Sequence, residues 1–470
     1  MVTLTPILND KMPVPLYQQL FNYIKEAIVN RDILPGDKLP SLRGMSKSLN
    51  ISITTIELAY DQLLVEGYIN SKPKSGYYVS NISLQNDDQT ALPYKCPIDD
   101  FRDSHCFFEK APKMDSLVDP ASFNFIKWKS CSNRIFNEYS SLLLTEGDIQ
   151  GEPPLRDEIS KYIYQSRGVR CSLDQVVIAA GTQQLINLLC LILNRIGIDH
   201  VSFENPGYIP VRSIFRDRGF KMTLVPIDKD GITIEKLPAN IPSTVYVSPS
   251  NQFPTGSVMP AARRYALLDW ACNNKSIIIE DDYNSELRYD SRPVPSLQGL
   301  DNRDQVVYLG SFSSTLFPSI KISYMVLPKN LHKLFRESLG SYVQTCSKAE
   351  QLTLALYMYN GYYQTNLRKQ RNLNARKIQI ATGAIIKYGH NKIKILNNSS
   401  GLHMLLKIPN KGRSVGDICD SAAAAGLTIV PVYGPERNDD FSIVMFYYTR
   451  IPIKEMDDAI KNGANLLINR

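Results

Sequence analysis

The first eighty residues show the periodic apolar pattern of a small helical domain. Between residues 16 and 31, apolar side chains recur at three- and four-residue spacing, which places them on one face of a helix. Ser41 and Ser52 are suitable N-caps for two further helices, over residues 42–49 and 53–66, because a serine hydroxyl accepts hydrogen bonds from the first turn. The pattern therefore predicts a long helix followed by two helices joined by a tight turn.

A hairpin is predicted directly after these helices. Residues 68–70 and 77–79 are β-type segments, and the stretch between them contains Pro73 and Gly76, which favour a turn. Residues 1–80 are therefore predicted to form a helix-turn-helix with a β wing. The polar stretch that follows has neither the periodicity of a helix nor that of a strand, and we expect residues 81–115 to be a linker.

The remainder of the chain alternates short apolar runs with longer helical stretches. Val, Ile and Tyr dominate the short runs and turn residues bound them, which is typical of an α/β fold with a mostly parallel sheet. We expect a large α/β domain over residues 116–345 and a smaller α+β domain over residues 346–470. The predicted strands are residues 176–180, 201–203, 245–247, 276–280 and 306–309.

Length and composition agree with a globular protein of several domains. A chain of 470 residues is too long for one hydrophobic core, and 43% hydrophobic with 21% charged residues is ordinary for globular proteins. The chain has no run of about 18 apolar residues that would span a membrane. The N-terminus lacks the pattern of a signal peptide, and the eight cysteines are scattered, so a cytoplasmic protein with reduced thiols and no metal site is expected.

The positions of the cations argue for nucleic acid more than the mild net charge of +7 does. Lys and Arg residues gather on the second helix, its approach and the wing, as phosphate contact on one face requires. The alternative is a helical domain that binds another protein. Because of the wing we favour DNA, with the third helix entering the major groove at its start. The residues expected to contact DNA are Lys38, Ser41, Arg43, Ser52, Thr54, Thr55, Lys72, Lys74, Gly76 and Tyr77.

The run from Pro35 to Arg43 (PGDKLPSLR), the Thr54-Thr55 pair and Glu66-Gly67 closely resemble the GntR family of bacterial regulators. The resemblance implies a winged helix that binds an operator in double-stranded DNA. In one departure, Ile53 occupies the position where the family usually has an arginine that contacts a base or phosphate. We therefore expect one direct contact to be lost or replaced.

Polar motifs follow the predicted strands, at the edge of the sheet where ligands bind in such folds. Gly181-Thr182-Gln183 opens a helix after the first strand, and its free N–H groups would suit a phosphate. Each motif alone has an ordinary explanation as a helix cap or a packing residue. After the later strands come Tyr208, Asn251, Asp281, Tyr283, Ser311, Ser313, Ser314 and Lys321.

This ordered set resembles fold-type I aminotransferases, which use pyridoxal phosphate, and the whole chain resembles the MocR/GabR-type regulators. The resemblance implies that Tyr208 stacks on the cofactor ring and that Asp281 pairs with the ring nitrogen. It also implies that Tyr283 and Asn251 lie near the ring hydroxyl. A carboxylate at the ring nitrogen keeps it protonated and makes the ring an electron sink. The residues implied around the phosphate are Gly181, Thr182, Gln183, Ser311, Ser313 and Lys321.

Three departures remove the chemistry of the family. Ser314 occupies the position of the Schiff-base lysine, and a hydroxyl cannot form an imine. Lys321 replaces the phosphate-binding arginine, which keeps the charge but loses the bidentate fork. The arginine that clamps a substrate carboxylate would fall near Val444, and we expect the nearby Arg437 and Arg450 to be solvated surface residues. No catalytic residue is therefore predicted.

The sequence thus predicts a DNA-binding transcription regulator whose aminotransferase-like domain senses an effector and dimerises without catalysis. We expect a small-molecule effector, no membrane contact, a homodimer, and noncovalent binding of pyridoxal phosphate at most. Two alternatives stay open. One is a pyridoxal-phosphate-dependent aminotransferase with an accessory DNA-binding module, which would need a nucleophilic lysine. The other is a regulator whose C-terminal domain only dimerises.

Overall fold

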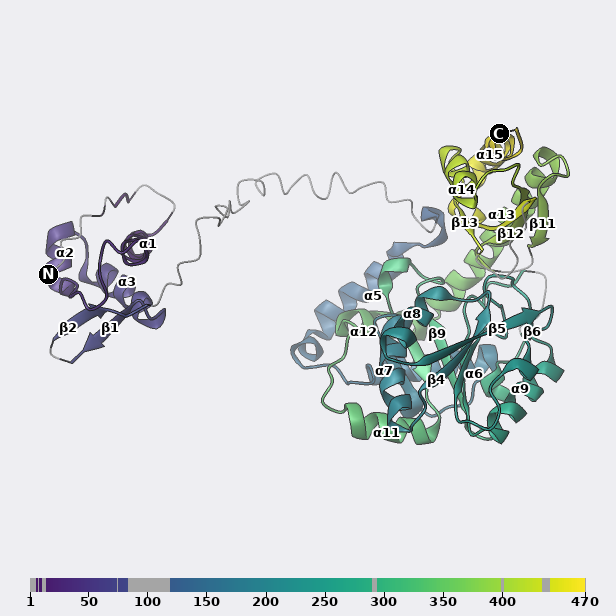
Figure 1. Ribbon diagram of the computed structural model, residues 1–470, viewed down its shortest axis with the longest axis horizontal. Coiled ribbons are helices and arrows are strands. Elements are labelled where there is room, and N and C mark those ends of the chain that lie inside the picture. The colour runs from purple at the N-terminus through teal and green to yellow at the C-terminus, as the bar shows by residue number, and fades with distance from the viewer. Residues whose placement is uncertain are drawn as a thin grey trace. The chain divides into compact units, whose positions relative to one another are not determined.

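A computed structural model describes residues 6, 8–10, 14–73, 75–82, 119–289, 294–398, 401–432 and 440–469. Contacts between residues divide the chain into two units, Met1–Ala111 and Pro112–Arg470 (Figure 1). Each unit is described by itself below. Lys74, Arg437 and most of the predicted linker lie outside the described residues.

The first unit has the helices and the hairpin that the sequence predicts. Ser41 accepts a hydrogen bond from the N–H of Gly44 and Ser52 accepts one from the N–H of Thr55, so both predicted N-caps are confirmed. Apolar residues of all three helices and of the hairpin form one core around Leu20 and Ile56. The elements are α1 (Leu16–Val29), α2 (Leu42–Leu49), α3 (Ile53–Val65), β1 (Ile69–Lys72) and β2 (Gly76–Val79).

The second unit is built on an eight-stranded, mostly parallel sheet with the order β3-β10-β9-β8-β7-β4-β5-β6. β10 is antiparallel to both of its neighbours, β3 and β9, and β6 is antiparallel to β5. The strands are β3 (Val176–Ala179), β4 (His200–Asn205), β5 (Lys221–Asp228), β6 (Gly231–Ile232), β7 (Thr244–Val247), β8 (Ile277–Asp281), β9 (Val306–Ser311) and β10 (Ser323–Val326).

Helices cover both faces of this sheet, which makes three layers. Successive side chains of a strand point to opposite faces, and in β3 Val176 and Ile178 join one core while Val177 and Ala179 join another. On the first face pack α5 (Phe125–Glu138), α6 (Pro153–Arg167) and α12 (Lys348–Tyr359). On the second face pack α7 (Thr182–Arg195), α8 (Ile209–Asp217) and α11 (Lys329–Leu339). The structure also has α9 (Ala261–Asn273) and α10 (Leu297–Leu300).

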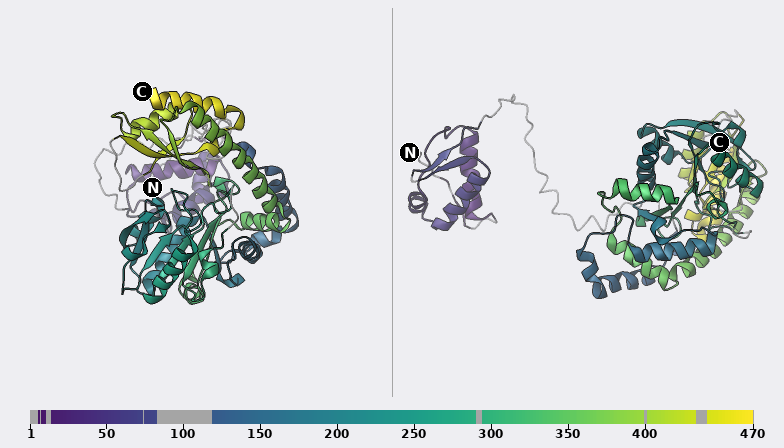
Figure 2. Two further views of the ribbon diagram at one scale, coloured as in Figure 1. Left: turned by 90° about the vertical axis from the view of Figure 1, so that its right-hand side faces the viewer. Right: turned by 90° about the horizontal axis from the view of Figure 1, so that it is seen from below.

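A smaller four-stranded antiparallel sheet, with the order β11-β12-β14-β13, forms the C-terminal lobe. The long helix α13 (Tyr362–Tyr388) joins the lobes, because Tyr363 packs in the core of the large sheet and Ile378 in that of the small one (Figure 2, left, green helix). The other elements of the C-terminal lobe are β11 (Lys394–Asn397), β12 (Met404–Pro409), α14 (Val415–Ala424), β13 (Ile429–Pro431), β14 (Phe441–Phe446) and α15 (Met456–Asn469).

The structure places α12 with the large sheet, although the predicted small domain begins at residue 346. Cys346, Leu354 and Met358 belong to the same core as α5 and α6. The core of the small lobe takes its residues from Ile378 onward. Among the described residues, no helix is both long and apolar enough to cross a lipid bilayer.

Candidate functional site

A cavity of about 440 Å³ lies beside the loops that follow strands β3, β4, β8 and β9. It is therefore at the carboxyl ends of the parallel strands, the usual ligand site of such sheets. Ser314 lines it together with nearly all of the residues that the sequence analysis assigned to a cofactor. These are Gly181, Thr182, Gln183, Tyr208, Asp281, Tyr283, Ser311, Ser313 and Lys321.

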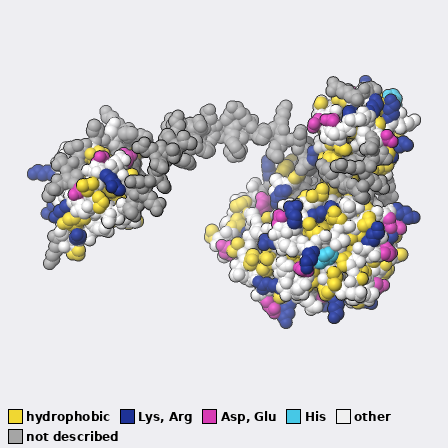
Figure 3. Space-filling model, viewed as in Figure 1, with side chains coloured by type: hydrophobic (Ala, Val, Ile, Leu, Met, Phe, Trp, Pro, Cys, Tyr) yellow, Lys and Arg dark blue, Asp and Glu magenta, His cyan; other side chains and the backbone are white. Residues whose placement is uncertain are grey.

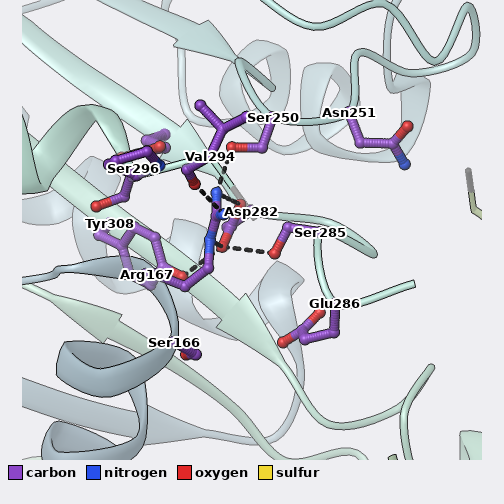
Figure 4. A network of polar contacts seen from close by, with 12 residues as sticks. Ser166, Arg167, Ser250, Asn251, Asp282, Ser285, Glu286, Val294, Ser296 and Tyr308 are labelled. Carbon is purple, nitrogen blue, oxygen red and sulfur yellow. Dashed lines mark hydrogen bonds and ion pairs between the residues drawn. The ribbon is translucent and has the colours of Figure 1, made fainter. Parts of the chain in front are cut away.

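Asn251 is the predicted site residue that does not line this cavity. It lines a much smaller hollow with His403 and Asn397, and its Nδ2 donates to the main-chain oxygen of Tyr283 at 3.5 Å. Figure 4 shows the Asn251 amide turned away from the side chains of Arg167 and Asp282. The structure therefore brings Tyr283 to the cavity wall and leaves Asn251 behind it.

The N-terminus of α7 forms one wall of the cavity. Gly181 precedes the helix with φ +91°, a left-handed conformation that favours glycine. Thr182 and Gln183 occupy the first helical positions, where main-chain N–H groups have no partner within the helix. These N–H groups and the positive end of the helix dipole suit an anion, as the sequence indicated.

A partly buried carboxyl group, that of Asp281, lines the same cavity. Asp281 ends β8, and the Tyr246 hydroxyl donates a hydrogen bond to its Oδ2. Burial raises the pKa of Asp281 to about 6, while the hydrogen bond from Tyr246 lowers it. The group is therefore mostly ionised at neutral pH and can pair with a protonated ring nitrogen.

A buried carboxyl group, which the sequence analysis missed, lies on β4, near enough to Asp281 for the two charges to repel. Glu204 accepts a hydrogen bond from the N–H of Ser248 at 3.2 Å and is 4% exposed. Burial raises the pKa of Glu204 to about 8. Glu204 sits on β4 among apolar residues, and in the sequence it looks like an ordinary end of a strand.

Aromatic rings line the cavity mouth. The ring of Tyr208 lies edge-on to Phe253, with centroids 5.8 Å apart, and Phe253 lies edge-on to Tyr283 at 6.1 Å. Tyr208 also packs against the core beneath α7 and α8. It therefore serves as a packing residue and still presents part of its surface to the cavity.

The loop after β9 carries Ser314 and is held by α13. Gln370 Nε2 donates to the main-chain oxygen of Ser314 at 3.1 Å, and Asn366 Nδ2 donates to that of Thr315 at 3.0 Å. These contacts fix the backbone of the loop at Ser314 and Thr315. Lys321, with φ +48°, is exposed and lines the same cavity.

The position predicted for the carboxylate clamp is part of the core of the small lobe. Val444 is fully buried in β14, so its side chain packs among apolar residues. Arg450, expected at the solvated surface, is instead half-buried, with its guanidinium 4.9 Å from the centroid of the Tyr447 ring. That expectation was wrong because Tyr447 packs against the guanidinium.

A buried ion pair beneath the cavity was not found from the sequence (Figure 4). Arg167 Nε donates to Asp282 Oδ2 at 2.7 Å and its Nη2 donates to Oδ1 at 3.0 Å. Ser285 and Tyr308 donate to the same carboxylate at 2.8 and 2.5 Å. Although burial opposes ionisation, Arg167 holds the pKa of Asp282 below its usual value. In the sequence, an arginine in the last turn of a helix resembles many surface residues.

The first unit presents exposed cations on the wing and on α2. The Nζ atoms of Lys72 and Lys38 lie 4.6 and 5.7 Å from the centroid of the Tyr78 ring. Arg43 on α2 and Thr54 at the start of α3 are exposed as well. Ile53, at the position where the sequence analysis expected a lost contact, is 45% exposed. Figure 3 shows that cationic and anionic side chains are mixed over the visible face of the second unit.

The two neighbouring tyrosines of the wing have different roles. Tyr77, a predicted contact residue, packs edge-on against Tyr60, with centroids 5.0 Å apart. Tyr78 lies on the side of the lysines and hydrogen-bonds to Ser75 at 2.6 Å. Strand alternation explains the difference, and it could have indicated Tyr78 as the outward residue.

Residues 16–79 match the gntR family of bacterial regulatory proteins, and residues 125–358 match aminotransferase class I and II. The transcriptional regulator YdeL of Bacillus subtilis is 38% identical over 86% of each chain. The pyridoxine biosynthesis regulator PdxR of Corynebacterium glutamicum is 29% identical over 97% of this chain and 98% of its own. The probable rhizopine catabolism regulator MocR of Rhizobium meliloti is 29% identical over 85% and 83%.

Solved aminotransferases share the fold of the second unit. A kynurenine aminotransferase of Pyrococcus horikoshii matches with a TM-score of 0.63 and 22% identity, covering 81% of this chain and 96% of its own. The α-aminoadipate aminotransferase LysN of Thermus thermophilus matches with a TM-score of 0.64 and 22% identity, covering 76% and 94%. At such identities the likeness shows the fold alone.

Proposed function

The chain belongs to the MocR/PdxR-type transcriptional regulators, in which a GntR domain is fused to an aminotransferase-like domain, and from this premise we propose that the second domain senses a small molecule without catalysis. One observation carries the proposal. The residues expected around a cofactor line one cavity together with Ser314, and we infer that Ser314 takes the place of the family's lysine. A regulator of this kind acts in the cytoplasm, where its DNA lies.

The residues at the cavity fit pyridoxal phosphate as a noncovalent ligand. The N–H groups at Thr182 and Gln183, with the hydroxyls of Ser311 and Ser313, would hold the phosphate. Lys321 would add a point charge, without the two parallel hydrogen bonds of an arginine. When bound, this cofactor supplies an electron sink.

The ring would lie between the carboxyl group and the aromatic wall. Asp281 would hold the proton on the ring nitrogen, and Tyr246 keeps that carboxylate in place by its hydrogen bond. Tyr208 would cover one face of the ring, and Tyr283 would lie on the side of the ring hydroxyl. Asn251 lies behind Tyr283, so we assign it the role of supporting that residue.

We also propose that the second unit forms a homodimer. Large apolar side chains are exposed on α5, α12 and the segment between α5 and α6, with Ile126, Leu144 and Tyr359 at 71%, 88% and 75%. They border a mostly apolar hollow lined by Ile135, Leu142 and Tyr359 among others. Exposed apolar patches of this kind mark protein interfaces.

Replacing Lys38 and Lys72 by alanine is expected to weaken binding to all DNA sequences alike. Each lost phosphate contact reduces the slope of log K against log salt by about 0.9. Fluorescence anisotropy on DNA duplexes over a salt series measures both quantities. Lys25→Ala is the control, since Lys25 lies on α1 beside Glu66 and not beside the wing tyrosine. An unchanged salt slope in the double variant would count against the wing.

No covalent bond between the chain and pyridoxal phosphate is expected. Ser314 lacks an amine, and Lys321, which also lines the cavity, is assigned to the phosphate in this proposal. The test is mass spectrometry of the protein after borohydride reduction with excess pyridoxal phosphate, together with an assay for amino-group transfer. A stable pyridoxyl adduct on Lys321, or measurable turnover, would contradict the proposal and favour the alternative of a pyridoxal-phosphate-dependent aminotransferase.

A further inference from the structure

A second cavity, of about 300 Å³, is lined in part by Arg167 and shares no lining residue with the cofactor-type cavity. It is bounded by the end of α6, the loop after β8 and the first turns of α13. The lining residues that carry charge or hydrogen-bonding groups include Tyr162, Ser166, Glu286, Gln364, Arg368 and Arg371.

Two of the three arginines that line this cavity come from α13, and the third is Arg167 at the end of α6. α13 contains no Asp or Glu, and it contributes Arg368 and Arg371 to the cavity. Arg371 Nε donates to the main-chain oxygen of Glu286, and Arg368 Nε donates to that of Gln364 at 3.5 Å. Neither guanidinium forms an ion pair with any carboxylate among the described residues.

A carboxyl group without a cationic partner lies in the same cavity. Glu286 Oε1 accepts a hydrogen bond from the Tyr162 hydroxyl at 3.0 Å, and no described cation lies within ion-pair distance of it. Arg167 is not available, because its guanidinium is engaged with Asp282, and Glu286 stands apart from that pair (Figure 4). Gln364 Oε1, also on the lining, is buried without a hydrogen-bond partner.

We propose that this cavity binds a second small molecule, a zwitterion of the amino-acid class. Arg368 and Arg371 take its carboxylate, and the carboxyl group of Glu286 and the amide oxygen of Gln364 take its amino group. Guanidinium groups suit a carboxylate because they donate several hydrogen bonds from one plane. The volume is at the lower end for small-molecule sites, which fits a ligand of this size.

The protonation behaviour of Glu286 agrees with a cationic partner. Burial raises the pKa of Glu286 to about 7, so the group is partly protonated at neutral pH when the cavity holds no cation. An ammonium group beside it favours the ionised form. The bound amino group therefore stabilises the ionised carboxylate of Glu286, which burial alone disfavours.

A ligand here would contact the helix that holds the Ser314 loop. Arg368 and Arg371 face the cavity, while Asn366 and Gln370 on a neighbouring face of α13 hold the main-chain oxygens of Thr315 and Ser314. The same helix continues into the core of the small lobe. Any effect of this ligand on DNA binding rests on the proposed function, whereas binding of the ligand to the cavity does not.

Calorimetric titration of the full chain with L-serine, L-leucine, L-glutamine and L-glutamate tests the site. At least one of them is expected to bind, and its amide and its deaminated acid, which each lack one charged group, are expected to bind at least tenfold more weakly. Arg368→Met and Glu286→Gln should each weaken binding at least tenfold. Arg376→Met is the matched control, because Arg376 is an exposed cation of the same helix outside the cavity.

Three results would overturn the inference. The first is that none of the four amino acids binds. The second is that neither cavity variant changes the affinity. The third is that inorganic phosphate or the deaminated acid binds equally tightly, which would show a simple anion site. DNA binding by the same preparations is measured in parallel. A chain that binds DNA normally but no amino acid contradicts this site and leaves the proposed function standing.

Discussion

Asp282→Ala is expected to destabilise the aminotransferase-like domain by about 3–5 kcal/mol, because it leaves a buried guanidinium without its counter-charge. Arg167 is 3% exposed, and both carboxylate oxygens of Asp282 bond to it. The hydroxyls of Ser285 and Tyr308 would lose their acceptor as well. Differential scanning calorimetry of the full chain measures the loss, as a lower midpoint for the transition of this domain.

The exposed ion pair between Arg263 and Asp228 supplies the control. Its atoms are 2.9 Å apart, but the side chain of Asp228 is 45% exposed, and exposed pairs contribute at most about 1 kcal/mol. Asp228→Ala should therefore leave the midpoint nearly unchanged. The double variant Arg167→Met, Asp282→Leu is expected to be less destabilised than the two single variants added together. Equal effects of Asp282→Ala and Asp228→Ala would show that the buried network is not a structural anchor of the cavity floor.

Ser314→Lys is expected to convert the cavity into one that bonds covalently to pyridoxal phosphate. Ser314 lines the cavity, and the loop that carries it is held by Gln370 and Asn366, so a lysine at this position would direct its amine to the same space. The expected result is a visible absorption band after addition of the cofactor and a borohydride-stable adduct at position 314. The covalent bond should tighten binding by more than tenfold.

Ser314→Met is the matched control, since it adds similar bulk without an amine. It should show no band and no adduct. The further change Asp281→Ala in the Ser314→Lys background should weaken or shift the band, because it removes the partner of the ring nitrogen. If the Ser314→Lys variant binds no pyridoxal phosphate at all, the cavity takes a ligand outside cofactor chemistry, and the residue roles proposed for that cofactor fail.

The elements that position the cavity were predictable because each is specified locally. The predicted strands of the large sheet are short apolar runs, and their central residues are buried on both faces. β5 and the strands of the small lobe were not predicted. In β5 and β11 most side chains are partly or fully exposed, so their apolar pattern is weaker. β12 and β14 were missed although most of their side chains are buried. β10 was missed although it is fully buried, because it follows the Ser314 loop so closely.

The order of motifs along the chain determined the family, since it depends only on which residue follows which strand, and the expectation for Ser314 rests on that same order. Local chemistry also determined the caps at Ser41 and Ser52, which depend on residues three positions apart. The tertiary structure alone decided the charge pairing. Arg167 and Asp282 are far apart in the chain, and nothing near either residue indicates its partner. The tertiary structure also brought Arg371 of α13 to the loop after β8, where its Nε donates to the main-chain oxygen of Glu286. Burial decides whether such charges are solvated surface groups or binding groups, and burial follows from packing between distant segments.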